Sequence, residues 1–263
     1  MKRALFFVND IKPESVEDYL TAAAYLNSIG WEHTRIPMNE PESLYDFGMV
    51  FGGDGTFLWA AQIFSAMNLP MAGVNTGTLG FLPTIRSEDI IPAIDRIIKG
   101  EYRIEECMMI NAYRPSDGGD LGNALNDIVL KNKMEHNVGH FKIYVNDTLL
   151  YDISADGVII STPTGSTAYV LSLGGPLVAP SCRLMIIQPI APHTLNSRAV
   201  AVDSSQSIKV VFDEQKTSIS RDGRMIQPNQ GSILIKKADM ITKIIRFKDY
   251  DFYKTVSEKL NRG

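Results

Sequence analysis

Short apolar runs alternate with longer stretches of helical spacing from Arg3 to Gly100. The run at residues 4–8 predicts a buried strand. Pro13 then opens a stretch whose apolar positions fall on one helical face, namely Tyr19, Ala22, Ala23 and Leu26. We expect Gly30 to end this helix in the left-handed conformation that glycine tolerates. Such an order of strand and helix is typical of βα units around a parallel sheet.

The βα alternation continues up to Gly100. Residues 49–51 and 70–74 predict two further strands. The helix between them has an apolar face made by Phe57, Ala60, Ala61, Phe64 and Met67. We expect Ser87 to cap another helix, because a serine hydroxyl can accept a hydrogen bond from a free N–H of the first turn. That helix is predicted to end at Gly100.

The pattern changes after Glu101, where β-rich runs replace helical spacing. These runs are residues 141–145, 148–153, 157–160, 184–187, 208–212, 232–235 and 241–247. Asn146-Asp147 and Asp222-Gly223 predict tight hairpin turns, since Asn, Asp and Gly tolerate positive φ angles. We therefore expect an α/β domain at residues 1–100 and a β-rich domain at residues 101–247. The closing segment 248–263 has weak helical spacing, and we group it with the first domain while leaving its packing open.

Composition places the chain among folded globular proteins. It has 263 residues, of which 44% are hydrophobic and 21% charged, which suits one large or two ordinary domains. The net charge of −4 and the absence of a long basic run argue against nucleic-acid binding. No apolar stretch is long enough for a membrane span or a signal peptide. The spacing of Cys107 and Cys182 matches neither a disulfide framework nor a zinc site, so we expect the protein to be located in the reducing cytoplasm.

The strongest local signal is the turn Gly52-Gly53-Asp54-Gly55-Thr56 between a predicted strand and a predicted helix. Its glycines let the backbone approach a ligand closely, and the helix start offers free N–H groups to a phosphate. The Asp54 carboxylate would repel that phosphate unless a metal ion lies between them or the carboxylate faces a hydroxyl nucleophile. Both roles belong to phosphoryl transfer. The alternative is a structural turn in which Asp54 only caps the helix. The run matches neither the Walker motif nor the dinucleotide-binding motif.

A hydroxyl-rich loop at residues 162–169 is the second candidate site. Its hydroxyls and amides can hydrogen-bond a sugar or a phosphate, and Tyr169 can lie against a base. The alternative is a polar turn whose hydroxyls cap a helix. Asp156-Gly157 precedes this loop, and Gly174-Gly175-Pro176 follows it. The pair Asn126-Asp127, before an apolar run, is either a ligand contact or a strand-entry turn.

Hydrolase and structural-metal chemistry find little support in the sequence. The four histidines have no Glu or Cys at metal-ligand spacing; they are His33, His136, His140 and His193. No serine stands in a G-x-S-x-G elbow. We therefore expect no fixed metal site in the protein.

Taken in order, the motifs resemble those of the NAD kinase family. The resemblance covers Gly52 to Thr56 and the pair Asn126-Asp127, which stands where the family has Asn followed by Glu or Asp. It also covers the block from Asp156 to Pro176. The segment from Pro192 to Arg198 is similar to the family's Pro-His-x-Leu-x-x-Arg. Lipid kinases and phosphofructokinases carry similar Gly-Gly-Asp-Gly runs, whereas the loop at 162–169 favours NAD kinases.

The resemblance implies a fold and a catalytic group. The fold is a Rossmann-like α/β domain with a parallel sheet, followed by a β-sandwich-like domain, with NAD bound in the cleft between them and at a subunit contact. Asp54 would accept the proton of the adenosine 2′-hydroxyl. The donor phosphates of ATP, with Mg²⁺, would lie on the loop formed by Gly52, Gly53, Gly55 and Thr56.

The resemblance also implies contacts to NAD beside Asp54 and Gly55. Asn126 and Asp127 would hold the nicotinamide-side ribose. The adenosine side would contact Thr167, Ala168, Tyr169, Val170, Leu171 and Ser172. Asp156 and Ala191 would line the nicotinamide or the ligand of a neighbouring subunit. An approximate alignment adds His140, Ser154 and Gln230. Because Ser154 stands where some members have Arg, we expect no charged contact to a phosphate there.

The leading hypothesis is phosphorylation of the 2′-hydroxyl of NAD by ATP, with polyphosphate left open as a donor. A lipid or sugar kinase with the same glycine-rich turn is the alternative enzyme. A non-catalytic NAD(H) sensor is the alternative of another class, and the presence of Asp54 argues against it, because a sensor needs no base there. We expect a homodimer or homotetramer, since a β-rich half must pair or cover its sheet edges.

Overall fold

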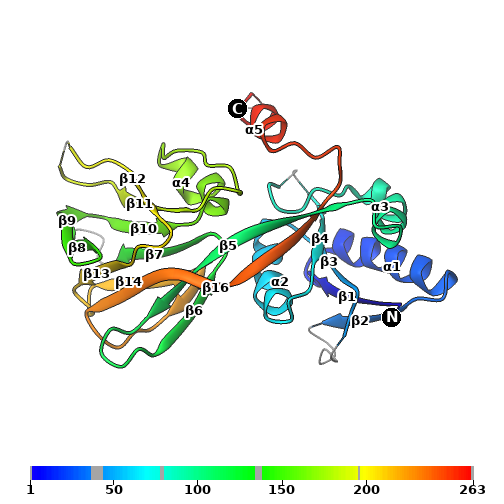
Figure 1. Cartoon of the computed structure of the whole chain (residues 1–263), viewed down its shortest axis with the longest axis horizontal. Coiled ribbons are helices and arrows are strands. Elements are labelled where there is room, and N and C mark those ends of the chain that lie inside the picture. The colour runs from blue at the N-terminus through cyan, green and yellow to red at the C-terminus, as the bar shows by residue number, and fades with distance from the viewer. Residues whose placement is uncertain (1, 37–43, 78–79, 134–137, 195, 262–263) are drawn as a thin grey trace. The chain divides into compact units, whose positions relative to one another are not determined.

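The computed structural model describes residues 2–36, 44–77, 80–133, 138–194 and 196–261 (Figure 1). The chain divides into two compact units. Unit 1 comprises Met1–Glu106 and Thr242–Gly263, and unit 2 comprises Cys107–Ile241. Two long strands, β5 (Arg103–Tyr113) and β16 (Ser232–Arg246), belong to both units. The domain bounds drawn from the sequence stay a prediction.

Unit 1 is built on a parallel sheet in the order β2-β1-β3-β4-β16. Its first four strands are β1 (Arg3–Val8), β2 (Glu32–Ile36), β3 (Phe47–Phe51) and β4 (Met71–Val74). Its helical elements are α1 (Pro13–Ser28), α2 (Asp54–Ala66), the 3₁₀ turn η1 (Ser87–Asp89), α3 (Ile90–Ile98) and α5 (Phe252–Leu260). Buried side chains of β1, β3 and β4 pack with those of α1 and α3 to form one core.

In unit 1, the two helix ends predicted at glycines are observed, but the helix cap predicted at a serine is not. Gly30 and Gly100 have φ angles of 74° and 71°, which confirms their predicted left-handed conformation. Ser87 lies inside η1, and its hydroxyl donates to the Asp18 carboxylate at 2.7 Å, so the predicted cap is wrong. Strand β2 was not predicted, because its side chains are mostly polar and only Ile36 is fully buried.

Unit 2 contains antiparallel strands in two sheets. One sheet continues from β16 through β13 and β8 to β9, with β5 pairing β16 and β6, and the other has the order β12-β11-β10-β7-β14-β15. The additional strands are β6 (Asp120–Ala124), β7 (Asp127–Asn132), β8 (Gly139–Val145), β9 (Thr148–Ala155), β10 (Gly157–Ser161), β11 (Leu184–Ile190), β12 (Val200–Asp203), β13 (Ile208–Phe212), β14 (Thr217–Arg221) and β15 (Arg224–Ile226). Apolar side chains from both sheets form one core. The expected α/β and β-sandwich-like classes are confirmed.

Both predicted hairpin turns occur in unit 2. Asn146 has a φ angle of 53° between β8 and β9, and Asp222 and Gly223 have 46° and 78° between β14 and β15. The runs 232–235 and 241–247 were predicted as separate strands but lie in or just past one strand, β16. The sequence predicted two strands because polar residues at 236, 237 and 239 interrupt the apolar pattern, although they do not interrupt the strand.

Candidate functional site

The glycine-rich turn joins β3 to α2 at the carboxyl edge of the parallel sheet. The Gly52 N–H donates to the Val74 carbonyl at 3.1 Å, and its φ angle is 155°. A Cβ at Gly52 would lie 2.6 Å from Thr56 Oγ1, so this position accepts only glycine without rearrangement. By contrast, Gly53 and Gly55 have open space where a Cβ would be. The turn is therefore fixed at its start and accessible around Asp54.

Asp54 is the first residue of α2, and its carboxylate is held by another loop. The N–H groups of Phe81 and Leu82 donate to its two oxygens at 3.4 and 3.1 Å. A Cβ on Gly80 would lie 2.3 Å from Asp54 Oδ1, so the loop approaches closely only because residue 80 is glycine. The helix is preceded by Gly53 and has no side-chain cap. The alternative that Asp54 is only a helix cap is therefore wrong.

A buried arginine orients the loop that holds Asp54. Arg246 donates to the carbonyls of Leu82 and Phe81 at 2.9 and 3.3 Å. Its Nε donates to Glu105 at 3.0 Å, and the two side chains are 2% and 12% exposed. The peptide between Phe81 and Leu82 accepts from Arg246 through its oxygen and donates to Asp54 through its N–H, so the arginine sets the direction of that amide. Sequence reasoning missed this pair, which is 141 residues apart.

Two asparagines follow strands at the same edge of the sheet. Asn9 follows β1, and its Nδ2 donates to Thr56 Oγ1 at 3.1 Å. Asn75 follows β4, and its buried Oδ1 has no partner within the described ranges. Open α/β sheets bind ligands beyond the carboxyl ends of their strands. A polar residue directly after each predicted strand was the available signal for both asparagines.

In unit 2, the structure brings two predicted motifs into contact. The Thr162 N–H donates to the Asn126 carbonyl at 2.9 Å, and the Thr162 hydroxyl donates to the Leu125 carbonyl at 2.5 Å. A Cβ on Gly165 would lie 2.1 Å from the Asn126 carbonyl oxygen. The pair Asn126-Asp127 and the hydroxyl-rich loop thus form one structural site, although they are distant in sequence.

Polar atoms without a partner gather around this loop. Asn126 Oδ1, Thr164 Oγ1 and Gln188 Oε1 are buried and make no hydrogen bond among the described residues. Gln188 also lies beside Gly175, where a Cβ would be 2.7 Å from its Oε1. Buried polar groups are nearly always satisfied, so such atoms point to a missing ligand or water. They make this loop the candidate binding site of unit 2.

Asp222 fixes the Asn126-Asp127 segment and was seen in the sequence only as a turn residue. Its carboxylate accepts hydrogen bonds from the N–H groups of Leu125, Asn126 and Asp127 at 2.8, 2.8 and 3.2 Å. Burial raises the pKa of Asp222, and these amides oppose that shift. Burial, and then the nearby Asp222 carboxylate, raise the pKa of Asp127 to about 7. The Asp127 carboxyl group therefore takes up a proton near neutral pH.

The rest of the hydroxyl-rich loop and the three residues after it form two short turns of helix. These are η2 (Thr164–Thr167) and α4 (Tyr169–Ser172). The Ser166 hydroxyl donates to the Val178 carbonyl at 3.2 Å and accepts from its N–H at 2.9 Å. Of the predicted adenosine contacts, Val170 is buried and Ser172 is exposed, whereas the remaining four are half-buried: Thr167, Ala168, Tyr169 and Leu171.

A second group of predicted residues gathers at the opposite end of β10. The Asp156 N–H donates to the Ile190 carbonyl at 3.0 Å, next to Ala191, which has a φ angle of 42°. His140 pairs with Ser154 across β8 and β9. Asp127 instead pairs with Ser161, at the other end of β10. The five residues of β10 span about 13–16 Å, so the structure separates the two groups by that length.

Gln230 stands apart from both groups of predicted residues. The side chain of Gln230 donates to the Ser232 carbonyl at 3.1 Å, and no described contact joins it to either group. His136 and Leu195 lie outside the described residues. No group of three or more metal-ligating side chains occurs in the part of the chain that the structure describes.

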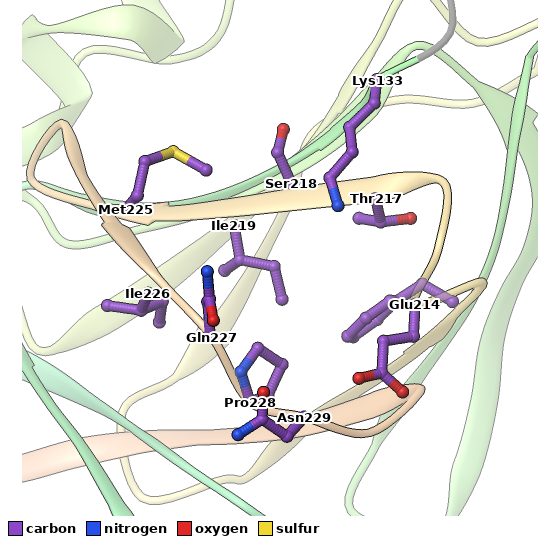
Figure 2. Close-up of a pocket in the computed structure, with 11 residues that line it drawn as sticks. Lys133, Glu214, Thr217, Ser218, Ile219, Met225, Ile226, Gln227, Pro228 and Asn229 are labelled. Carbon is purple, nitrogen blue, oxygen red and sulfur yellow. The ribbon is translucent and has the colours of Figure 1, made fainter.

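Unit 2 also contains a pocket of about 360 Å³ beside β14 and β15 (Figure 2). Figure 2 shows Ile219 and Ile226 with polar side chains around them, including Lys133, Glu214 and Gln227. None of the predicted NAD contacts is among its described lining residues. We therefore do not place the nucleotide there.

None of the described helices is both long and apolar enough to cross a membrane.

Comparisons with known proteins match both halves of the chain. A family model described as the ATP-NAD kinase N-terminal domain matches residues 6–102, and one described as the C-terminal domain matches residues 125–247. An NAD kinase of Heliobacterium modesticaldum is 34% identical over 97% of each chain. An NAD kinase of Caldanaerobacter subterraneus is 39% identical over 90% of this chain and 87% of the relative.

Solved structures show the same fold. The crystal structure of yeast NADH kinase complexed with NADH has a TM-score of 0.85 at 20% identity and covers 98% of this chain and 87% of the other. An NAD kinase from Archaeoglobus fulgidus in complex with ATP has a TM-score of 0.79 at 24% identity and covers 99% of each chain. With both domain matches, the chain belongs to the ATP-NAD kinase family, whose known reaction is phosphorylation of the 2′-hydroxyl of NAD with ATP.

Proposed function

We propose that Asp54 accepts the proton of the adenosine 2′-hydroxyl as NAD is converted to NADP by ATP. The observation that carries this role is the fixed carboxylate at an otherwise open turn. The amides of Phe81 and Leu82 hold its oxygens, while Gly53 and Gly55 leave space beside it. A base positioned in this way accelerates phosphoryl transfer by aligning the hydroxyl and removing its proton.

NAD binds to the two groups of residues in unit 2. The Asn126 amide oxygen and the Thr164 hydroxyl lack partners in the described chain, and they offer hydrogen bonds to ribose hydroxyls. Tyr169, which is half-buried at the end of the hydroxyl-rich loop, supplies an aromatic face for adenine. Asp156 and Ala191 lie at the far end of β10. They serve the nicotinamide end or the nucleotide of a neighbouring subunit.

ATP places its phosphates on the glycine-rich turn and the start of α2, where the Gly52 N–H is already bonded to the Val74 carbonyl. A helix start favours an anion through its unpaired N–H groups and its dipole. Mg²⁺ bound with ATP would neutralise charge on the donor phosphates. Asp54 is the carboxylate of this turn that can face the ion, in keeping with the few protein ligands that nucleotide-bound Mg²⁺ needs.

The proposal extends to assembly and location. Strands β9, β12 and β15 stand at sheet edges in unit 2, and an identical subunit can cover such edges. We therefore propose a homodimer or homotetramer. In the described chain neither Cys107 nor Cys182 forms a disulfide, which suits the reducing cytoplasm.

An acceptor panel tests the reaction. Purified protein is incubated with Mg-ATP and, in turn, NAD, NADH, a hexose and a diacylglycerol, and phosphorylated products are separated by chromatography. We expect NADP from NAD and no product from the hexose or the lipid. A sugar or lipid phosphate would contradict the proposal. NAD binding without any NADP formation would instead favour the sensor alternative.

A further inference from the structure

Helix α5 returns the end of the chain to the loop that holds Asp54. In its last turn, Lys259 places its ammonium group 3.8 Å from the centroid of the Phe81 ring. The backbone N–H of the same Phe81 donates to the Asp54 carboxylate. Lys259 therefore contacts the side chain of Phe81, while Asp54 accepts a hydrogen bond from the backbone of the same residue. No motif in the sequence pointed to this lysine.

The ammonium of Lys259 is partly desolvated and is not neutralised by a close carboxylate. Burial lowers the pKa of Lys259, and the negative charge of Asp54 opposes that shift. Over the described ranges, Lys259 forms no ion pair within 4.0 Å. Lys254, on the same helix, is exposed. Lys259 thus places a positive charge on the residue that also bonds Asp54.

We propose that Lys259 is a donor-binding residue whose ammonium group holds the phosphate chain of ATP beside Asp54. This inference rests on the proposed function, because it takes the turn at Asp54 as the site of phosphoryl transfer. The donor phosphates would meet a carboxylate at this place, and like charges repel. A fixed cation beside the carboxylate offsets that repulsion. A lysine suits the role, because a compact point charge can follow phosphate oxygens during transfer.

The competing explanation is that Lys259 only anchors α5 on the Phe81 ring. Lys259→Met separates the two, because methionine keeps an apolar stem on the ring and removes the charge. Lys259→Arg keeps the charge and the ring contact. Lys254→Met removes a charge from the same helix and is the matched control. Circular dichroism and thermal unfolding of each variant show whether α5 and the fold persist.

Steady-state kinetics with Mg-ATP and NAD give the first readout. We expect Lys259→Met to lower kcat/KM for Mg-ATP by about tenfold to a hundredfold, the usual loss for one hydrogen bond to a charged group. The KM for NAD should change by less than about twofold, since NAD is assigned to other residues. Lys259→Arg should recover much of the loss, and Lys254→Met should match the wild type. Equal kcat/KM for Mg-ATP in wild type and Lys259→Met would overturn the inference.

Calorimetry with inorganic tripolyphosphate gives a second readout that needs no turnover. The full-length wild type should bind it, and Lys259→Met should bind about tenfold more weakly. Equal affinities would overturn the role of Lys259 even if NADP forms normally. Weaker binding by the variant would support it even if the wild type makes no NADP, a result that would count against the proposed function alone. A variant that also loses its α5 helicity and is not rescued by arginine would show an anchoring role and overturn the inference.

Discussion

Asp54 illustrates how one side chain takes its direction from residues that do not neighbour it in sequence. The glycines around it were visible as a motif, because glycine spacing in a turn reflects backbone geometry that local sequence determines. Gly80, Phe81 and Leu82, which orient the carboxylate, were not visible. Their role depends on a loop that folds back from the next βα unit. Asp222 was missed for the same reason, since its three amide partners are 95 to 97 residues away.

The first prediction concerns the proton acceptor. Asp54→Asn should retain the fold and most of the affinity for NAD but lower kcat by about 10²- to 10⁴-fold, the usual contribution of one positioned general base. The amide has nearly the same shape but cannot accept the proton. NADP formation by the purified variant is the measurement, with calorimetric NAD binding as the control. Turnover near that of the wild type would remove Asp54 from the chemistry.

The second prediction concerns the protonation of Asp127. Its pKa of about 7 in the folded protein lies above the ordinary value of 3.8, so the folded state holds this proton more tightly than the unfolded state. The resulting stabilisation is complete below the ordinary value and is lost as the pH rises through about 7. Asp127→Asn carries no such charge and should not show this loss. The difference in free energy of unfolding, variant minus wild type, should rise by about 2 kcal/mol between pH 5 and pH 8.

Urea unfolding at several pH values measures that difference. Other groups with raised pKa values, such as Asp18, are present in both proteins and largely cancel. Parallel stability curves for variant and wild type over pH 5 to 8 would show that Asp127 is ionised like an exposed carboxyl group.

At the scale of elements, the apolar pattern predicted most buried strands. It missed several strands with polar faces, and it also missed β5, although residues 107–112 of that strand are buried. Strands β1, β3 and β4 are buried along nearly their whole length, so they appear as continuous apolar runs. Strands β12 and β15 are short and half-exposed, and β2 has one fully buried side chain. Tertiary pairing rather than local pattern makes these segments strands.

The third prediction tests the connection between β16 and the loop at Asp54. Arg246→Met should lower the free energy of unfolding by about 3–5 kcal/mol, since it removes the buried cation that bonds Glu105 and two carbonyls. Chemical denaturation measures this loss. Replacing both side chains, in Arg246→Met/Glu105→Leu, should cost less than the single change, because the buried negative charge is removed together with the positive one. A single variant as stable as the wild type would show that the pair does not support the loop.

For the whole molecule, the change from βα alternation to β-rich runs predicted the class of each half. The structure adds that β5 and β16 belong to both units and that the C-terminal helix α5 belongs to unit 1. Sequence pattern could not place α5, because its apolar residues show only weak helical spacing and none of them is fully buried. The sequence motifs identified the family, and the domain matches confirm it.

The last prediction concerns assembly. Residues at the two ends of β10 are both assigned to NAD, and the exposed edges β9, β12 and β15 suit packing between copies of unit 2. If one subunit completes the NAD site of another, dilution should lower the specific activity. NAD should oppose this loss, because a ligand that binds only the assembled form stabilises it. Light scattering and activity are measured over the same range of protein concentration, with and without NAD. A monomer whose specific activity stays constant on dilution would place the whole site in one chain and exclude the shared arrangement.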